Sequence, residues 1–250
     1  MRAESAVLLP HRARFFSLRN RTRNRRALIF RRLLAPAPDA TILDLGGAGG
    51  EHIAGILPRH DPNRVTVADI DPVALESART RYGFNTVLLD ERARALPFDR
   101  RAFDILFCSS VIEHVTVPKD EIYACRSTQD FAARARANQR AFAGEIRRVC
   151  GRYFVQTPYK YFAVESHSLL PMPVILLPRR AQIATLRYAR KLGIKHTNPD
   201  YLLFDRREMH AMFPDADIHC ERWFGLTKSI MAVRTLVPSL LFFVPFAPWW

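Results

Sequence analysis

A glycine-rich run is the first place in this sequence where residue types and spacing suggest chemistry. The segment DLGGAGG (44–50) completes the apolar run TILDL (41–45) and precedes a predicted helix. Glycines let a backbone approach a ligand closely, and a helix N-terminus carries partial positive charge. The run does not match the dinucleotide fingerprint GxGxxG, because Ala48 or His52 stands where a glycine is required. A nicotinamide oxidoreductase is therefore disfavoured.

Carboxylates stand at the ends of three successive predicted strands. Asp69 ends the second apolar run (65–70), where a carboxylate can accept both hydroxyls of a ribose. Asp90 and Glu91 end the third run (86–90), where either can receive an adenine amino group. Asp44 precedes the glycines and is placed to hold a cationic group. Together these acids predict a site for an adenosine that carries positive charge.

This arrangement resembles the class I S-adenosylmethionine-dependent methyltransferases, particularly the small-molecule type 11 group. The similarity continues through LPF (96–98), FDILFCSSVIEHV (103–115) and EIRRVCGRYFVQTP (145–158). It covers residues 41–158 in the order and spacing of the family, and several motifs in register are more specific than any one of them. The resemblance implies S-adenosylmethionine as the cofactor.

The family pattern assigns roles to individual positions of this chain. It implies that Asp44 and Gly46 lie against the methionine part, that Asp69 binds the ribose and that Asp90 binds the adenine. The implied cofactor-binding residues are Asp44, Gly46, Gly47, Gly49, Asp69, Asp90, Glu91 and Ser109.

Two departures from the family pattern qualify these roles. Ala48 stands where the family usually has glycine, so we expect a slightly wider turn. The gap from Asp90 to Leu96 is longer than in most of the family, which leaves Glu91 a rival for the adenine contact. Ser109, at the mouth of the fourth predicted strand, is expected beside the methionine end.

Methyl transfer from a sulfonium requires that the acceptor be aligned with the methyl–sulfur bond in a dry cavity. An alcohol acceptor also needs a base to remove its proton. Glu113 and His114 follow the fourth predicted strand at the edge where open α/β sheets place substrates. His114 is the best-placed base by chain position; the alternative is a structural histidine hydrogen-bonded under the loop.

A second cluster of polar residues follows the fifth predicted strand. Glu165 and His167 are two residues apart in TPYKYFAVESHSLLP (157–171), so in an extended loop they point the same way. We expect them to form an oriented base or to bind a polar acceptor; the alternative is a lid that these residues tie down. Tyr159, Tyr161 and Phe162 are candidates for the wall of an acceptor pocket.

The pattern of apolar runs predicts the fold. Runs at 41–45, 65–70, 86–90, 103–109 and 152–156 alternate with predicted helices, which indicates a parallel sheet covered on both faces. The runs 217–224 and 228–234, joined by a turn at Gly225, are expected to form an antiparallel edge. We therefore expect an α/β, Rossmann-like, doubly wound and mostly parallel seven-stranded sheet with an antiparallel edge strand.

The chain divides by composition into an arm, a domain and a tail. Residues 1–40 are expected to be a basic helical arm, 41–235 the methyltransferase domain with 157–215 as a lid or substrate-recognition insertion, and 236–250 an apolar tail too short to span a bilayer. The net charge is +14, and arginines are concentrated in the arm. The arm either packs on the domain through Phe15, Phe16, Leu18, Leu28 and Ile29, or binds an anionic membrane; nucleic acid is the least expected partner.

The four cysteines lack paired spacing, so neither a disulfide framework nor a metal site is expected, and a cytoplasmic location, peripheral to the membrane in one interpretation, fits. We expect a methyltransferase acting on a small molecule, with O-methylation of a sugar, lipid-linked or related metabolite preferred. The alternatives are an RNA methyltransferase and a non-catalytic scaffold that retains the fold.

Overall fold

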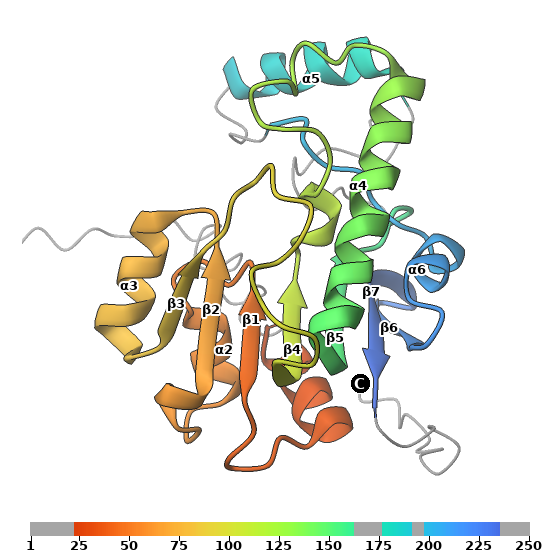
Figure 1. Ribbon diagram of the computed structural model, residues 1–250. Coiled ribbons are helices and arrows are strands. Elements are labelled where there is room, and N and C mark those ends of the chain that lie inside the picture. Colours follow the sequence, from red (N-terminus) through yellow and green to blue (C-terminus); the bar gives the residue numbers. More distant parts are fainter. Residues whose placement is uncertain (1–22, 163–176, 192–197, 236–250) are drawn as a thin grey trace, which may run out of the picture.

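The structure is a computed structural model that describes residues 23–162, 177–191 and 198–235, and every structural statement below concerns these residues. Their centre is a seven-stranded sheet in the order β3-β2-β1-β4-β5-β7-β6 (Figure 1). The strands are β1 (Ile42–Leu45), β2 (Val65–Asp69), β3 (Asn85–Leu88), β4 (Phe103–Ser109), β5 (Cys150–Pro158), β6 (Asp217–Trp223) and β7 (Leu226–Arg234).

Strands β1 to β5 pair in parallel, and β7 pairs antiparallel with both β5 and β6. The β6–β7 hairpin thus supplies the antiparallel edge that the sequence predicted, with β6 outermost. This arrangement confirms the predicted Rossmann-like fold class. The carboxyl ends of the five parallel strands meet at one edge of the sheet, which is where such folds bind their ligands.

Helices cover both faces of the sheet, and their ends are set by local sequence. They are α2 (Glu51–Ile56), α3 (Pro72–Tyr82), α4 (Thr128–Val149), α5 (Arg179–Lys191), α6 (Arg206–Met212), the 3₁₀ turns η1 (Pro62–Arg64) and η2 (Ile112–His114), and a helix over residues 23–34. In α3, Asp71 accepts hydrogen bonds from the backbone N–H groups of Val73 and Ala74, and Gly83 ends the helix at φ +71°. None of the described helices has the length and apolar character needed to cross a membrane.

Two apolar layers flank the sheet. One contains Phe30 and Leu34 of the helix over 23–34 together with α2 and α3, and the other contains buried residues of α4 and α6. Part of the predicted arm therefore packs on the domain. Leu28, expected on the packed face, is 61% exposed; the helix is rotated so that Ala27, Phe30 and Leu34 face the sheet instead, at helical spacing.

The third strand is shorter than predicted. It ends at Leu88, so Asp90 lies in the turn that follows rather than at the last strand position. There, Asp90 Oδ1 accepts a hydrogen bond from the Arg92 N–H at 2.8 Å. This is the Asx turn by which an aspartate side chain competes with strand pairing, and it explains the early end of the strand.

Candidate functional site

A buried carboxylate lies beneath the glycine turn at the end of β1. Asp44 is 2% exposed, and its Oδ2 has no hydrogen-bond partner among the described residues. Burial, and secondarily the charge of Asp69, raises the pKa of this carboxyl group to about 8. A buried carboxylate without a partner is unfavourable by itself, and a cation brought against it would reverse that.

The turn above Asp44 is shaped by closely packed glycines, and a Cβ atom at Gly46 or Gly47 would require neighbouring atoms to move. A Cβ atom at Gly47 would overlap the carboxylate of Asp44, and one at Gly46, where φ is +73°, would overlap the side chain of Val111. A Cβ at Gly49 would crowd the carboxylate of Glu51. The backbone here is therefore packed to glycine dimensions, as a close approach to a ligand requires.

Asp69 holds the glycine turn against the end of β2. Its Oδ2 accepts a hydrogen bond from the Ala48 N–H at 2.8 Å, and its Oδ1 accepts one from the Asp71 N–H at 3.0 Å. Ala48 adopts φ +47°, a left-handed conformation that glycine takes more easily, so this departure from the family pattern is absorbed as local strain on the order of 1 kcal/mol. Each carboxylate oxygen keeps a second lone pair for a ribose hydroxyl.

The two candidates for the adenine contact occupy different surroundings. Asp90 and Glu91 are both exposed, beyond the end of β3. Glu91 Oε1 accepts a hydrogen bond from the Lys119 N–H at 3.2 Å, so this side chain reaches the loop between η2 and α4. The adenine role of Asp90, with Glu91 as its rival, stays a prediction.

A row of polar side chains extends the site along the sheet edge. Because side chains alternate between the faces of a strand, Asp44 of β1, Ser109 of β4 and Gln156 of β5 all point to the same face. Ser109 Oγ donates to Gln156 Oε1 at 2.7 Å, while the buried Gln156 Nε2 has no partner among the described residues. Sequence reasoning missed Gln156, although a glutamine inside the apolar run of β5 was a signal that could have found it.

The predicted catalytic pair after β4 divides in the structure. Glu113 is fully buried in η2, whereas the His114 side chain is 34% exposed. His114 Nδ1 lies 3.3 Å from Asp200 Oδ1. A carboxylate at Nδ1 favours the tautomer with its proton on Nδ1, in which Nε2 is the acceptor nitrogen of the ring. The arrangement can act as a base, with Asp200 as the orienting group.

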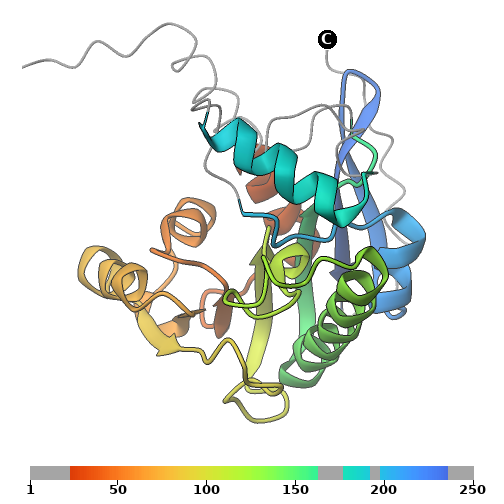
Figure 2. The ribbon, with the colours of Figure 1, turned by 90° about the horizontal axis from the view of Figure 1, so that it is seen from above.

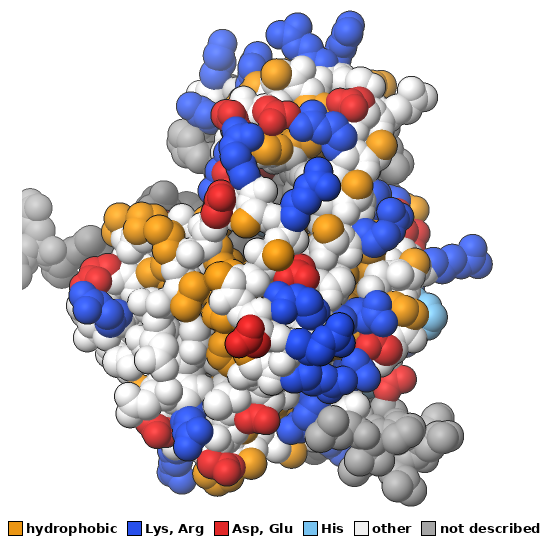
Figure 3. Space-filling view, viewed as in Figure 1, with side chains coloured by type: hydrophobic (Ala, Val, Ile, Leu, Met, Phe, Trp, Pro, Cys, Tyr) orange, Lys and Arg blue, Asp and Glu red, His pale blue; other side chains and the backbone are white. Residues whose placement is uncertain are grey.

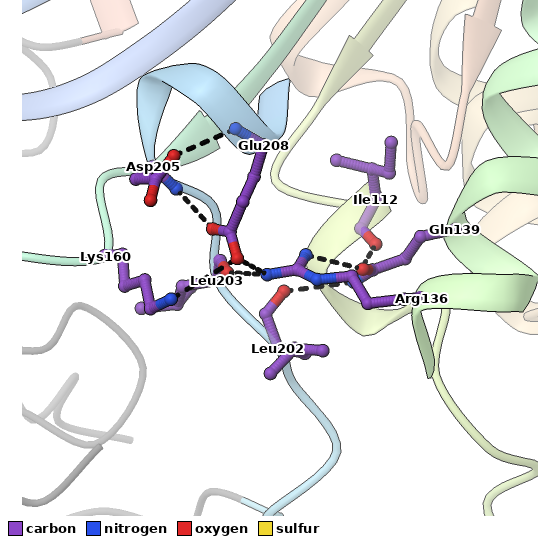
Figure 4. A network of polar contacts seen from close by, with 8 residues as sticks. All are labelled: Ile112, Arg136, Gln139, Lys160, Leu202, Leu203, Asp205 and Glu208. Atoms are coloured by element: carbon purple, nitrogen blue, oxygen red, sulfur yellow. Dashed lines mark hydrogen bonds and ion pairs between the residues drawn. The ribbon is translucent and has the colours of Figure 1, made fainter. Parts of the chain in front are cut away.

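Asp200 is a second residue that sequence reasoning missed. A polar network holds its segment beside η2, and Figure 4 shows the part formed by Ile112, Gln139 and Leu202. The buried Gln139 side chain of α4 donates to Ile112 O at 3.1 Å and to Leu202 O at 3.0 Å, which joins η2 to the segment 198–205. The Leu202 N–H donates to Glu113 O at 2.8 Å. These bonds hold the residues beside His114 against the residues near Asp200, and so keep the two side chains close together.

The same segment is tied down at its far end. Arg136 Nη2 donates to Leu203 O at 2.9 Å and to Glu208 Oε1 at 2.6 Å, and Lys160 Nζ donates to that oxygen at 3.3 Å (Figure 4). Asp205 and Glu208 form a reciprocal capping box that begins α6. No local sequence pattern in 198–205 indicates this role, because its partners come from α4 and from the residues that follow β5.

Helix α5 lies above the carboxyl edge of the sheet, next to the loop that precedes α4 (Figure 1). Its first residue, Arg179, is buried and stacks on the ring of Phe131, with its guanidinium 3.7 Å from the ring centroid. Arg179 also donates to Ile122 O at 3.2 Å, which joins α5 to the loop before α4. Glu165 and His167 lie outside the described residues, so their predicted role at the acceptor stays a prediction. Phe162 packs against Trp223.

No group of three or more His, Cys, Asp or Glu side chains within the described ranges is arranged to hold a metal ion. The four cysteines are unpaired thiols. Burial raises the pKa of the Cys108 thiol, which lies near Glu113 and Asp44, well above its ordinary value. Cys108 is accordingly a neutral core residue beneath the site.

Comparison with known proteins agrees with this geometry. Residues 42–129, which contain the glycine turn, Asp69 and η2, match the family model of a methyltransferase domain. The match and the fold confirm the predicted resemblance to the class I S-adenosylmethionine-dependent methyltransferases. A chloroplastic 2-methyl-6-phytyl-1,4-hydroquinone methyltransferase 2 of Oryza sativa subsp. japonica is 34% identical over 79 residues, which are 31% of this chain and 23% of that protein. The similarity thus spans about a quarter of the rice protein.

Solved structures extend the similarity in fold to most of the chain. Magnesium protoporphyrin IX methyltransferase of Synechocystis PCC 6803, solved with bound SAH, aligns with a TM-score of 0.51 and 13% identity, over 92% of this chain and 90% of that one. A possible exported protein of Bordetella parapertussis aligns with a TM-score of 0.53 and 15% identity, over 94% and 76%. At these identities the likeness is one of fold.

Proposed function

We propose that this protein is an S-adenosylmethionine-dependent methyltransferase that O-methylates a small molecule, with a sugar, lipid-linked or related metabolite as the acceptor class. The observation that carries the proposal is the buried Asp44 carboxylate, which has an unpartnered oxygen beneath a turn packed to glycine dimensions. The residues present fit the cofactor: an anion for its cationic methionine end, a carboxylate at the end of β2 for its ribose, and a backbone that admits close approach.

The residues divide the work of the reaction between them. Bound S-adenosylmethionine supplies an activated methyl group on a sulfonium. Asp44, the glycine turn and Asp69 would hold the donor in one orientation, which would position its methyl group for an aligned acceptor. His114 accepts the proton of the acceptor hydroxyl at Nε2, and Asp200 stabilises the imidazolium that results.

The preference for an oxygen nucleophile rests on this histidine–aspartate pair. A thiol or amine acceptor needs less help with its proton than an alcohol does, and a base held by a carboxylate is most useful for the alcohol. The names of two similar proteins, a hydroquinone and a porphyrin methyltransferase, also favour small-molecule acceptors. A membrane-proximal acceptor, with the protein bound peripherally, suits the basic composition of the chain.

Two measurements test the proposal. Calorimetric titration with S-adenosylhomocysteine should give saturable heat for the wild type and much weaker binding for Gly47→Ala. Label transfer from methyl-labelled cofactor to a fractionated extract should then mark a lipid, glycan or other small-molecule fraction. A wild-type protein that gives no heat of binding would support the non-catalytic scaffold and would reject the proposed methyltransferase activity.

Methylation of RNA is the alternative that the surface charge favours. Basic side chains gather on α5 and along α4 in the view of Figure 3, and Arg180, Arg187, Arg190 and Lys191 of α5 are all exposed. A polynucleotide partner predicts binding that weakens steeply with salt. Tight binding to RNA at physiological salt, with label appearing in the RNA fraction, would replace the small-molecule acceptor.

A further inference from the structure

The turn of the β6–β7 hairpin, here named the hairpin tip (Trp223–Leu226), exposes large apolar side chains. Phe224 is 90% exposed, Leu226 55% and Trp223 37%. The hairpin projects beyond the neighbouring strands (Figure 2). Exposed aromatic side chains grouped at the end of a projecting element are typical of interaction sites.

The backbone of the hairpin tip is an unfavourable place for a phenylalanine. Phe224 has φ +47° and Gly225 has φ +78°, so two successive residues adopt left-handed conformations. Such turns favour Asn-Gly, and a bulky residue at the first position is disfavoured by roughly 1 kcal/mol. Phe224 is therefore strained and almost fully exposed, and asparagine would make the hairpin more stable. We infer that the exposed ring contacts a binding partner.

The charges around the hairpin tip are positive. Arg222 precedes it, and Lys228 lies with Nζ 5.1 Å from the centroid of the Trp223 ring. Arg25 donates to Arg222 O at 3.1 Å, which adds a third cation at the base. The nearest carboxylate in sequence, Glu221, is 2% exposed and is neutralised by Arg26 at 3.2 Å. The segment 222–228 contains no acidic residue.

We propose that the hairpin tip inserts into the interface of an anionic lipid bilayer. Tryptophan and phenylalanine favour the interfacial region of a membrane, and cations behind them attract anionic headgroups. The register of β7 on β5 pairs Ser229 with Pro158, so the base of the tip lies at the carboxyl edge of the sheet, the edge that carries His114. Docking of the hairpin tip would therefore bring the candidate functional site toward the bilayer. This consequence rests on the proposed function, in which the acceptor is membrane-proximal.

Co-sedimentation of the full chain with vesicles tests the proposal. Vesicles of phosphatidylcholine with phosphatidylglycerol should retain the wild type, and pure phosphatidylcholine vesicles should retain it less. Phe224→Asn should weaken retention about tenfold, as expected for removing part of the burial of one aromatic side chain. It should not impair folding, because asparagine suits the left-handed turn. Val73→Ser is the matched control, since Val73 is 79% exposed on α3 and should not alter retention.

A fluorescence experiment locates the contact. Trp249→Phe and Trp250→Phe together leave Trp223 as the remaining tryptophan of the chain, and brominated lipid chains should then quench its emission. Retention that is equal for the wild type, Phe224→Asn and Val73→Ser would overturn the proposal, as would the absence of quenching. A dimer that Phe224→Asn dissolves would also overturn it, because the tip would then bind a second copy.

The two proposals fail separately. Phe224→Asn should bind S-adenosylhomocysteine as the wild type does. A wild type that binds vesicles through the tip but gives no heat with S-adenosylhomocysteine would reject the proposed function and retain the membrane contact. The reverse result would reject the membrane contact alone.

Discussion

The half of the site proposed to hold the methyl donor (the donor half) and the half proposed to meet the acceptor (the acceptor half) are built in different ways. The donor half consists of the glycine turn with Asp44 and Asp69, which lie at the ends of adjacent strands. The acceptor half joins His114 to Asp200, which are far apart in the chain. Gln139 of α4 links their segments through hydrogen bonds to Ile112 O and Leu202 O. A site built from local turns can be recognised from short sequence motifs. A site whose residues come from distant segments depends on how those segments pack together.

We expect substitutions in the donor half to weaken binding of S-adenosylhomocysteine. Substitutions in the acceptor half should instead lower the rate of methyl transfer. The two halves also differ in burial. The donor half contains a carboxyl group whose pKa burial raises to about 8. The acceptor half contains a partly exposed histidine beside a carboxylate.

The largest expected effect comes from Gly47→Ala. The added methyl group would overlap the carboxylate of Asp44, which is buried. We expect affinity for S-adenosylhomocysteine, measured by calorimetry, to fall by about 100-fold or more, equivalent to about 2.7 kcal/mol. Gly55→Ala is the matched control, since a Cβ there meets nothing within 4 Å. Equal losses in both variants would show that the turn is not packed as described.

The next largest effect is expected from substitutions in the acceptor half. His114→Ala should lower turnover by about 100-fold, the lower range for loss of a general base, with S-adenosylhomocysteine affinity unchanged. Asp200→Asn should lower turnover by a smaller factor, since it removes only the group that orients the ring. His210→Ala, an exposed histidine of α6, is the control. Normal turnover in His114→Ala would leave the histidine a structural role.

The raised pKa of Asp44 predicts two opposite pH dependences. The folded protein keeps a proton on Asp44 that the unfolded chain releases near its ordinary pKa of 3.8, so the free energy of unfolding should fall as pH rises from about 4 to about 8. A cationic ligand favours the ionised carboxylate, so S-adenosylhomocysteine affinity should rise over pH 6 to 8 by up to about tenfold per unit.

Thermal unfolding and calorimetry across this range test both slopes in wild type and Asp44→Asn. The variant should lose the Asp44 contribution to each slope and be more stable at pH 8 by about 2 kcal/mol, while it binds the ligand less well. Asp104→Asn is the control, because hydrogen bonds from Thr41 lower the pKa of Asp104 and its contribution is lost only in acid. Identical slopes in Asp44→Asn and wild type would contradict the burial argument.

The smallest expected effect comes from the network behind the acceptor half. Gln139→Leu removes the donors to Ile112 O and Leu202 O, two carbonyl groups that join η2 to the segment 198–205. We expect a loss of about 1–3 kcal/mol in stability and about tenfold in turnover, with S-adenosylhomocysteine affinity unchanged. Gln129→Leu, at an exposed position of the same helix, is the control. A parallel loss of ligand affinity would mean that the two halves are not separate.

Much of the fold could be predicted because its signals are local. Alternating apolar runs and helices produced the predicted sheet, and β4 matches its predicted bounds of 103–109. The error at β3, where Asp90 forms a turn with Arg92, arose because an aspartate side chain can compete with strand pairing, and an apolar run does not reveal that. The orientation of the helix over 23–34 depended on which face the sheet could accept.

The sequence by itself determined the local geometry of the residues that we propose to hold the methyl donor. A glycine turn and strand-end acids depend on backbone geometry and on the alternation of side chains, both of which act over a few residues. Only the tertiary structure decided that Asp200 meets His114, that Glu113 is fully buried and that Gln156 joins the row with Asp44 and Ser109. Those outcomes depend on packing between segments far apart in the chain, which no local pattern records.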